Sequence, residues 1–141
     1  DRLKRIERET DGKIRCHGYV DHDVLETVLQ SADVLVNLKS CGSVSGKLFE
    51  YISYRKPIVH FSGCADDPDA PTIESYPLGL LIRTYEGDDQ EKTERVVRFL
   101  CDSKGRTVPM EQILSIYRMN RPDYTRNLIL RKLGLSPVAS K

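Results

Sequence analysis

The sequence predicts an α/β fold in which helices connect the strands of a parallel sheet, with additional helices at the C-terminal end. Two observations lead to this prediction. Between residues 14 and 103, short apolar segments typical of strands alternate with longer segments of helical periodicity. After Gly105 only helical periodicity remains. This alternation is typical of a Rossmann-like doubly wound parallel sheet, and we expect about four to five strands.

The N-terminal part predicts a helix, a strand and a second helix. Residues 2–10 form a polar segment of helical pattern that ends at an Asp-Gly turn signal. Apolar and polar residues then alternate over 14–20, which predicts the first strand. Asp21 or Asp23 can cap the next helix, and Glu26 stands at capping-box spacing after Asp23. The apolar stripe of this helix covers 24–29.

Three later segments predict further strands, at 33–38, 57–61 and 79–82. Their apolar residues follow one another without alternation, as expected for parallel strands covered on both faces. A helix from about residue 46 to 55 joins the first two, and the Pro- and Asp-rich segment 62–77 separates the second from the third. The predicted crossovers are therefore helical.

The C-terminal part predicts only helices. Asp88 and Asp89 form a turn that opens the first of them, and two more stretches follow around 110–119 and 123–133, parted by Pro122. The sheet is small for such a fold, and the chain opens within a helical segment. We therefore expect residues 1–141 to be a single domain that is part of a longer two-domain protein.

Composition favours a small-molecule partner. Lys and Arg number 22 against 21 Asp and Glu, so the formal net charge is +1. Such a balance predicts neither a nucleic-acid partner nor attraction to an anionic membrane. No apolar run approaches the roughly 20 residues that span a bilayer, so no transmembrane segment is expected in this part.

The four cysteines are Cys16, Cys41, Cys64 and Cys101, spaced too widely for a CxxC metal or redox motif. We expect reduced thiols. The patterns around Cys16 and Cys101 predict packing in the core. Cys41 stands in a loop, with no neighbouring base that would make it a nucleophile.

The segment 40–47, Ser-Cys-Gly-Ser-Val-Ser-Gly-Lys, runs from a predicted strand directly into a helix. Small residues let backbone N–H groups approach an anion at the positive end of a helix, so Ser45, Gly46 and Lys47 predict a phosphate-binding cradle. It is not a Walker loop, because the glycines lack the GxxxxGK[ST] spacing and Leu48 follows the lysine.

Glu50 lies one helical turn beyond this cradle and shares a face with Gly46 and Lys47. A carboxylate there can accept hydrogen bonds from the vicinal hydroxyls of a ribose whose phosphates rest on the helix start. Lys47 would neutralise phosphate charge. The alternative is that Lys47 and Glu50 form a solvated helix face behind an ordinary cap at Ser45.

From about residue 14 to 100 the chain resembles the C-terminal, donor-binding domain of GT-B glycosyltransferases, in particular the retaining, family 4-like group. Five blocks carry the resemblance in the same order: Gly-Tyr-Val at 18–20, Ser-Ala-Asp-Val-Leu-Val-Asn-Leu at 31–38, Ser-Gly-Lys-Leu-Phe-Glu-Tyr-Ile at 45–52, Lys-Pro-Ile-Val at 56–59, and Gly-Leu-Leu-Ile at 79–82.

The resemblance implies a role for each matching residue. Glu50 would hold the donor ribose, residues 45–47 would surround the diphosphate, and the backbone near Tyr19 and Val20 would line the base pocket. It assigns no catalytic residue here. Many members carry a second glutamate eight positions before the ribose glutamate, where this chain has Gly42.

That departure leaves two alternatives for the sugar contact. Either Ser43 or Lys39 contributes it, or the chain belongs to a branch that uses the Ser-Gly-Lys-Leu-Phe-Glu-Tyr form without the first acid.

Other polar residues predict structural roles. Asp66, Asp67 and Asp69 stand in a Pro-rich loop, where neighbouring carboxylates are usually solvated, so no metal site is expected. His17 and His60 fall near the ligand-side ends of strands, where either could contact the donor, although a structural role is the more frequent outcome for such histidines.

The resemblance implies a glycosyltransferase that moves a sugar from a nucleoside-diphosphate donor to an acceptor hydroxyl, with no cofactor. Its acceptor site would lie in an N-terminal domain outside this chain, and the isolated chain would be inactive. The expected location is cytoplasmic, with any membrane association through the rest of the protein. The alternatives are a sugar-nucleotide epimerase of GT-B architecture and a non-catalytic module that binds a phosphate ligand or a protein.

Overall fold

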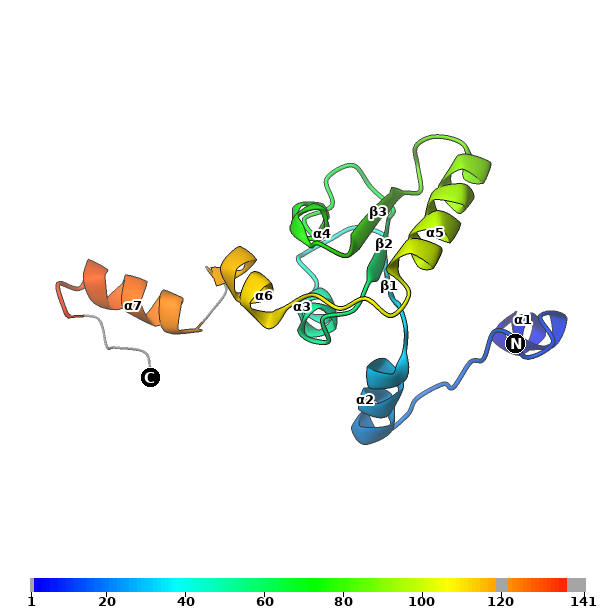
Figure 1. Cartoon of the computed structure of the whole chain (residues 1–141), viewed down its shortest axis with the longest axis horizontal. Helices are drawn as coiled ribbons and strands as arrows, with labels where there is room; N and C mark the ends of the chain where they lie inside the picture. The colour runs from blue at the N-terminus through cyan, green and yellow to red at the C-terminus, as the bar shows by residue number, and fades with distance from the viewer. Residues whose placement is uncertain (1, 119–121, 137–141) are drawn as a thin grey trace. The chain divides into compact units, whose positions relative to one another are not determined.

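The computed structural model describes residues 2–118 and 122–136. The chain divides into two compact units, Asp1–Ala32 and Asp33–Lys141, each described by itself. Figure 1 shows the elements of both units in chain order. No helix in the described ranges is long and apolar enough to cross a membrane.

The first unit contains two helices, α1 (Arg2–Glu9) and α2 (His22–Ser31). The strand predicted at 14–20 is wrong, because this segment is irregular. Gly18 has a φ of 67°, in the left-handed region, and this interrupts the extended backbone that a strand requires. The alternating pattern records which side chains are apolar, but it does not show that the backbone has a partner to pair with.

The second unit contains a parallel sheet of order β1-β2-β3, with helices between its strands. The strands are β1 (Leu35–Lys39), β2 (Ile58–Ser62) and β3 (Gly79–Arg83), and they are connected through α3 (Gly46–Ser53) and α4 (Ala70–Ser75). The α/β class and the parallel arrangement are thus confirmed. The described residues form three strands, fewer than the four to five predicted.

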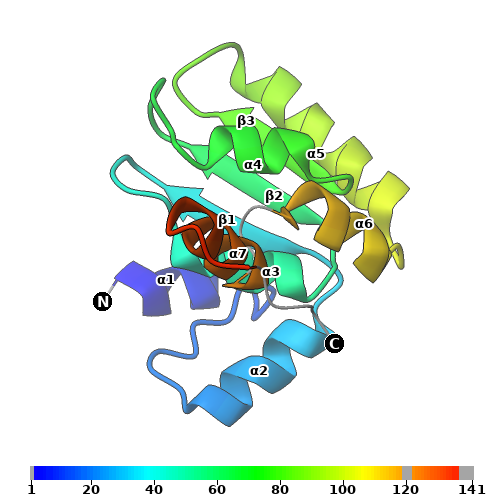
Figure 2. The ribbon, with the colours of Figure 1, turned by 90° about the vertical axis from the view of Figure 1, so that its left-hand side faces the viewer.

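Helices cover both faces of this sheet. The first two, α3 and α4, lie on one face, and α5 (Asp89–Ser103) lies on the other (Figures 1 and 2). The start of α5 is as predicted: the Asp88 side chain caps it by accepting hydrogen bonds from Gln90 N at 2.9 Å and Glu91 N at 3.2 Å.

Two features of the second unit differ from the sequence prediction. The segment 62–77 contains α4, whose first turn carries a proline, a residue tolerated there because the first helical N–H groups have no partner within the helix. Strand β1 is not covered on both faces, since Val36 is 50% and Leu38 74% exposed. These two side chains alternate with buried ones along the strand. Their face of β1 is exposed because α5, the helix on that side of the sheet, packs against β3, two strands away.

The helices predicted after Gly105 are confirmed as α6 (Met110–Ile116) and α7 (Pro122–Lys132). The predicted end of the first, residue 119, lies outside the described residues. Pro122 begins α7 rather than standing before it.

The core lies between the sheet and α3 and α4. It includes Leu48 and Ile52 of α3 and Ile73 of α4, all at most 4% exposed. Strand β2 is the central strand, and its Ile58 and Val59 are at most 1% exposed. Burial of these side chains fixes α3, and with it the loop that precedes this helix.

Gly79 is a point of close packing at the start of β3. A Cβ at this position would collide with the Ile73 carbonyl oxygen at the end of α4. We therefore expect Gly79→Ala to lower the free energy of unfolding by about 1–3 kcal/mol. Urea denaturation followed by circular dichroism measures the change. Gly46→Ala is the control, because nothing lies within 4 Å of its added Cβ; an equal effect of both substitutions would contradict the collision.

Candidate functional site

The loop between β1 and α3, residues 40–45, is called the cradle loop below. Lys39, the last residue of β1, stabilises this loop. Its Nζ donates hydrogen bonds to the Ser43 carbonyl oxygen at 2.7 Å and to Asp69 Oδ2 at 2.9 Å. The second oxygen of Asp69, Oδ1, accepts the Ser45 backbone N–H at 2.9 Å. One buried aspartate thus ties both the supporting lysine and the start of α3.

Behind the loop lies a buried polar network, made of Asn37, Lys39, His60, Asp67 and Asp69. His60 is 0% exposed and both of its ring nitrogens are bonded. Asn37 Nδ2 lies 2.9 Å from His60 Nδ1, and His60 Nε2 lies 2.7 Å from Asp67 Oδ2. An amide NH₂ only donates, so Nδ1 accepts and Nε2–H donates to Asp67, which is the bonding of a neutral imidazole. The structural role predicted for His60 is confirmed.

Asp67 and Asp69 are buried, at 6% and 0% exposed, so the expectation that these loop carboxylates are solvated is wrong. Asp66 beside them is exposed. The burial is possible because each buried carboxylate has several partners: Asp67 Oδ1 accepts the Asp69 N–H at 2.9 Å, and Lys39 Nζ lies 3.6 Å from the same oxygen.

Opposing effects act on the pKa of Asp67. Burial raises it, but hydrogen bonds from His60, the Asp69 backbone and Ser62 outweigh burial and lower the pKa to about 2. Asp67 is therefore ionised at neutral pH. In the described ranges no group of three or more His, Cys, Asp or Glu side chains is arranged to hold a metal ion.

Because of this lowered pKa, the free energy of unfolding depends on pH. An unfolded aspartate has a pKa near 3.9, so the lowered value contributes roughly 2 kcal/mol above about pH 4, lost as the pH falls toward about 2. We expect urea denaturation of the full chain between about pH 6 and 2 to show this loss. Asp67→Asn removes the titrating carboxyl and should have a shallower pH dependence. Parallel pH profiles for the two proteins would contradict the assignment.

The predicted phosphate-binding residues stand at the carboxyl end of β1, where ligands bind in open parallel sheets. Ser43, Gly46 and Lys47 are exposed, and Ser45 is half-buried. Within the described residues, the N–H groups of Gly46 and Lys47 donate to no acceptor, as expected in the first turn of a helix. The Ser45 N–H is committed to Asp69, and its hydroxyl makes no capping bond.

Glu50 is exposed on α3, one turn after the Gly46 and Lys47 amides. In the part of the chain that the structure describes, its carboxylate forms no hydrogen bond or ion pair; only its backbone oxygen is used, by the Ser53 hydroxyl. The carboxylate is therefore available to a ligand. Tyr19 and Val20 belong to the other unit, where Tyr19 is fully exposed and Val20 half-buried.

Sequence reasoning missed most of the polar network. A signal existed, because Asn37 and His60 are polar residues inside apolar strands, and such residues need buried partners. Core packing was predicted for Cys16 and Cys101. Cys16 is half-buried, and Cys101 is exposed, so that prediction is wrong for Cys101.

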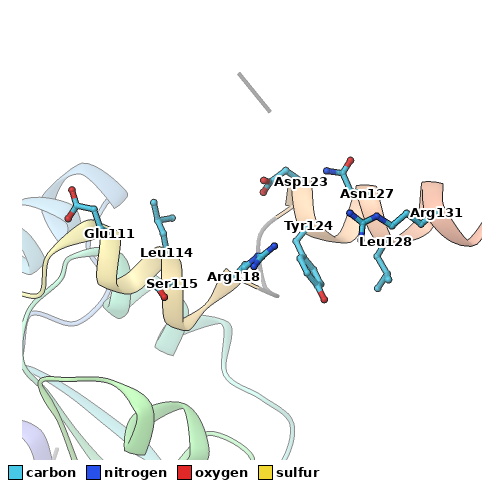
Figure 3. A pocket seen from close by; sticks show the side chains of 9 residues that line it. All are labelled: Glu111, Leu114, Ser115, Arg118, Asp123, Tyr124, Asn127, Leu128 and Arg131. Atoms are coloured by element: carbon cyan, nitrogen blue, oxygen red, sulfur yellow. The ribbon is translucent and has the colours of Figure 1, made fainter. Parts of the chain in front are cut away.

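Hollows large enough for a ligand lie elsewhere in the second unit. One of about 420 Å³ is lined from α6 by Glu111 and Leu114 and from α7 by Tyr124 and Arg131, among others (Figure 3). Another, of about 410 Å³, lies between α5 and strands β2 and β3. The cradle loop and Glu50 line neither of these two hollows.

Comparison with known proteins gives no match: no family model, no curated protein and no solved structure matches this chain. The function must therefore be argued from the site itself.

Proposed function

We propose that this chain is the donor-binding half of a glycosyltransferase, which transfers a sugar from a nucleoside-diphosphate sugar to an acceptor hydroxyl. The observation that supports it is a group of atoms without partners among the residues that the structure describes: the amides of Gly46 and Lys47 and, one turn further along α3, the Glu50 carboxylate. Donor groups for a phosphate and acceptor groups for a ribose thus stand together at the carboxyl end of a parallel strand. The resemblance of residues 14–100 to GT-B donor domains points to the same ligand.

Within this proposal, each residue of the site has a separate role. The phosphates would rest on the Gly46 and Lys47 amides and near the Lys47 ammonium group. Ser45 would contact them only through its hydroxyl, because Asp69 already accepts its N–H. Ser43 is exposed on the loop, whereas the Lys39 side chain is 9% exposed and its ammonium group is paired with Asp69, so we assign Lys39 a supporting role.

The chemistry supplied by this half is electrostatic. When the bond between sugar and diphosphate breaks, negative charge grows on the leaving diphosphate. The amides at the start of α3 are fixed by the helix backbone, so they would stabilise this charge without rearrangement, and the Lys47 ammonium would add a positive charge beside them. No proton transfer is assigned to this chain, and the acceptor would be held by a second domain.

The test is calorimetry of the full chain with uridine, guanosine and adenosine diphosphates, alongside inorganic pyrophosphate. We expect one nucleoside diphosphate to bind more tightly than pyrophosphate, because only the nucleotide offers hydroxyls to Glu50. Absence of binding by all three nucleotides would overturn the proposal. Binding of pyrophosphate as tight as that of every nucleotide would favour a simple phosphate-ligand module instead.

A further inference from the structure

Cys41 and Cys64 follow neighbouring strands at matching positions. The pairing of β1 with β2 continues past its last register pair, because the Gly63 N–H donates to the Lys39 carbonyl oxygen at 2.8 Å. A Cβ built on Gly63 would lie 3.0 Å from Ser40 Cα, so the two chain segments touch there. Cys41 and Cys64 are the next residues of these segments.

The two thiols are neighbours in space. A hydrogen bond with the Cys41 thiol, more than burial or the charges of Asp67 and Asp66, raises the pKa of the Cys64 thiol. Cys41 is exposed and Cys64 is half-buried. Neighbouring strands lie about 4.7–4.9 Å apart, within the roughly 4.4–6.8 Å between Cα atoms that a disulfide spans. The strand register and the close approach of Gly63 to Ser40 therefore place the two cysteines at neighbouring positions, which suits a bond between their sulfurs.

We propose that Cys41 and Cys64 are a thiol-modification site, at which a peroxide oxidant forms a reversible disulfide between the cradle loop and the segment after β2. Exposed Cys41 reacts first: its thiolate attacks hydrogen peroxide, the O–O bond breaks, and sulfenic acid and water result. The Cys64 sulfur then attacks the Cys41 sulfur, the S–O bond breaks, and the hydroxide leaves as water with the Cys64 proton. Two thiols are oxidised and one peroxide is reduced to two waters.

The bond would act on the cradle loop. Asp69 and Lys39 already fix its C-terminal half at Ser45 and Ser43. A bridge at Cys41 would also fix the N-terminal half, so the loop would be held from both ends. The disulfide itself does not depend on the proposed function.

The sequence makes the experiment direct, because trypsin leaves each cysteine on a different peptide: residues 16–39, 40–47, 56–83 and 99–104. The folded full chain is treated with hydrogen peroxide, alkylated, digested without reductant and analysed by mass spectrometry. We expect the link between peptides 40–47 and 56–83 to exceed every other pairing at least tenfold, and to disappear with dithiothreitol. Cys101→Ser should leave it unchanged.

Two controls distinguish a disulfide that the fold directs from random pairing of the thiols. In urea, Cys41 is 23 residues from Cys64 and 25 from Cys16, so loop entropy hardly distinguishes these pairs and the preference should vanish. In Cys64→Ser, Cys41 should accumulate as sulfenic acid that dimedone traps. The proposal is overturned if, in the folded chain, another pairing equals the 40–47 to 56–83 link, or if Cys41 is oxidised without joining Cys64.

Discussion

Asp69→Ala is expected to lower the free energy of unfolding of the second unit by about 3–5 kcal/mol, the largest effect of any single change considered. The Asp69 side chain is 0% exposed and pairs with Lys39 Nζ at 2.9 Å. Loss of this carboxylate would leave Lys39, whose side chain is only 9% exposed, with Asp67 at 3.6 Å as its remaining carboxylate partner. It would also leave the Ser45 N–H without its acceptor.

The measurement is urea denaturation of the full chain at neutral pH, followed by circular dichroism. Asp66→Ala is the matched control, an exposed aspartate of the same segment, and should change stability by no more than about 0.5 kcal/mol. Asp69→Asn should fall between the two, because its amide oxygen still accepts the Ser45 N–H while the charge is lost. Equal stability of Asp69→Ala and Asp66→Ala would show that the pairing with Lys39 contributes nothing.

The strands of the second unit were predictable because burial imposes a simple pattern on them. Predicted segments at 33–38, 57–61 and 79–82 correspond to β1, β2 and β3 within two residues at either end. Short, mostly apolar segments are typical of strands in a parallel sheet, and this holds even for β1, although its Val36 and Leu38 are exposed. Placement of the strands therefore needed no knowledge of their partners.

Other elements depended on information that lies far along the chain. The alternation at 14–20 matched a strand, but Gly18 adopts a left-handed conformation that the pattern does not reveal. The composition of 62–77 indicated a loop, although α4 forms there once Ile73 is buried in the core. Local composition gives the tendency of a segment, and tertiary burial decides between the alternatives.

The same limit applies to the site. The cradle and Glu50 follow from neighbouring residues, since a helix fixes their spacing. The residues that stabilise the cradle loop could not be predicted in this way, because Lys39 bonds to Asp69, which is 30 positions away in the sequence. Carboxylates in a Pro-rich segment gave no sign of burial, and only the polar residues within β1 and β2 indicated that buried partners must exist.

Glu50→Ala is expected to weaken nucleoside-diphosphate binding about 10- to 100-fold while leaving stability nearly unchanged. Hydrogen bonds to a charged group are worth about 1.5–3 kcal/mol, and about 1.4 kcal/mol corresponds to a factor of ten in affinity. The carboxylate is exposed and has no partner in the described residues, so its removal costs the fold little. Glu91→Ala, an exposed glutamate on α5, is the matched control and should leave affinity unchanged.

Comparison of the tightest-binding nucleotide with its 2′-deoxy form tests the contact itself. The native chain should prefer the ribonucleotide, because only its 2′-hydroxyl donates to Glu50, and the preference should disappear in Glu50→Ala. Measuring both nucleotides on both proteins forms a double cycle. It cancels any general effect of the substitution on surface charge, since both ligands carry the same phosphates. Pyrophosphate, which lacks the sugar, should bind the variant at least as well, because one negative charge near the cradle is gone. A ribose preference that survives in Glu50→Ala would place the sugar against another residue.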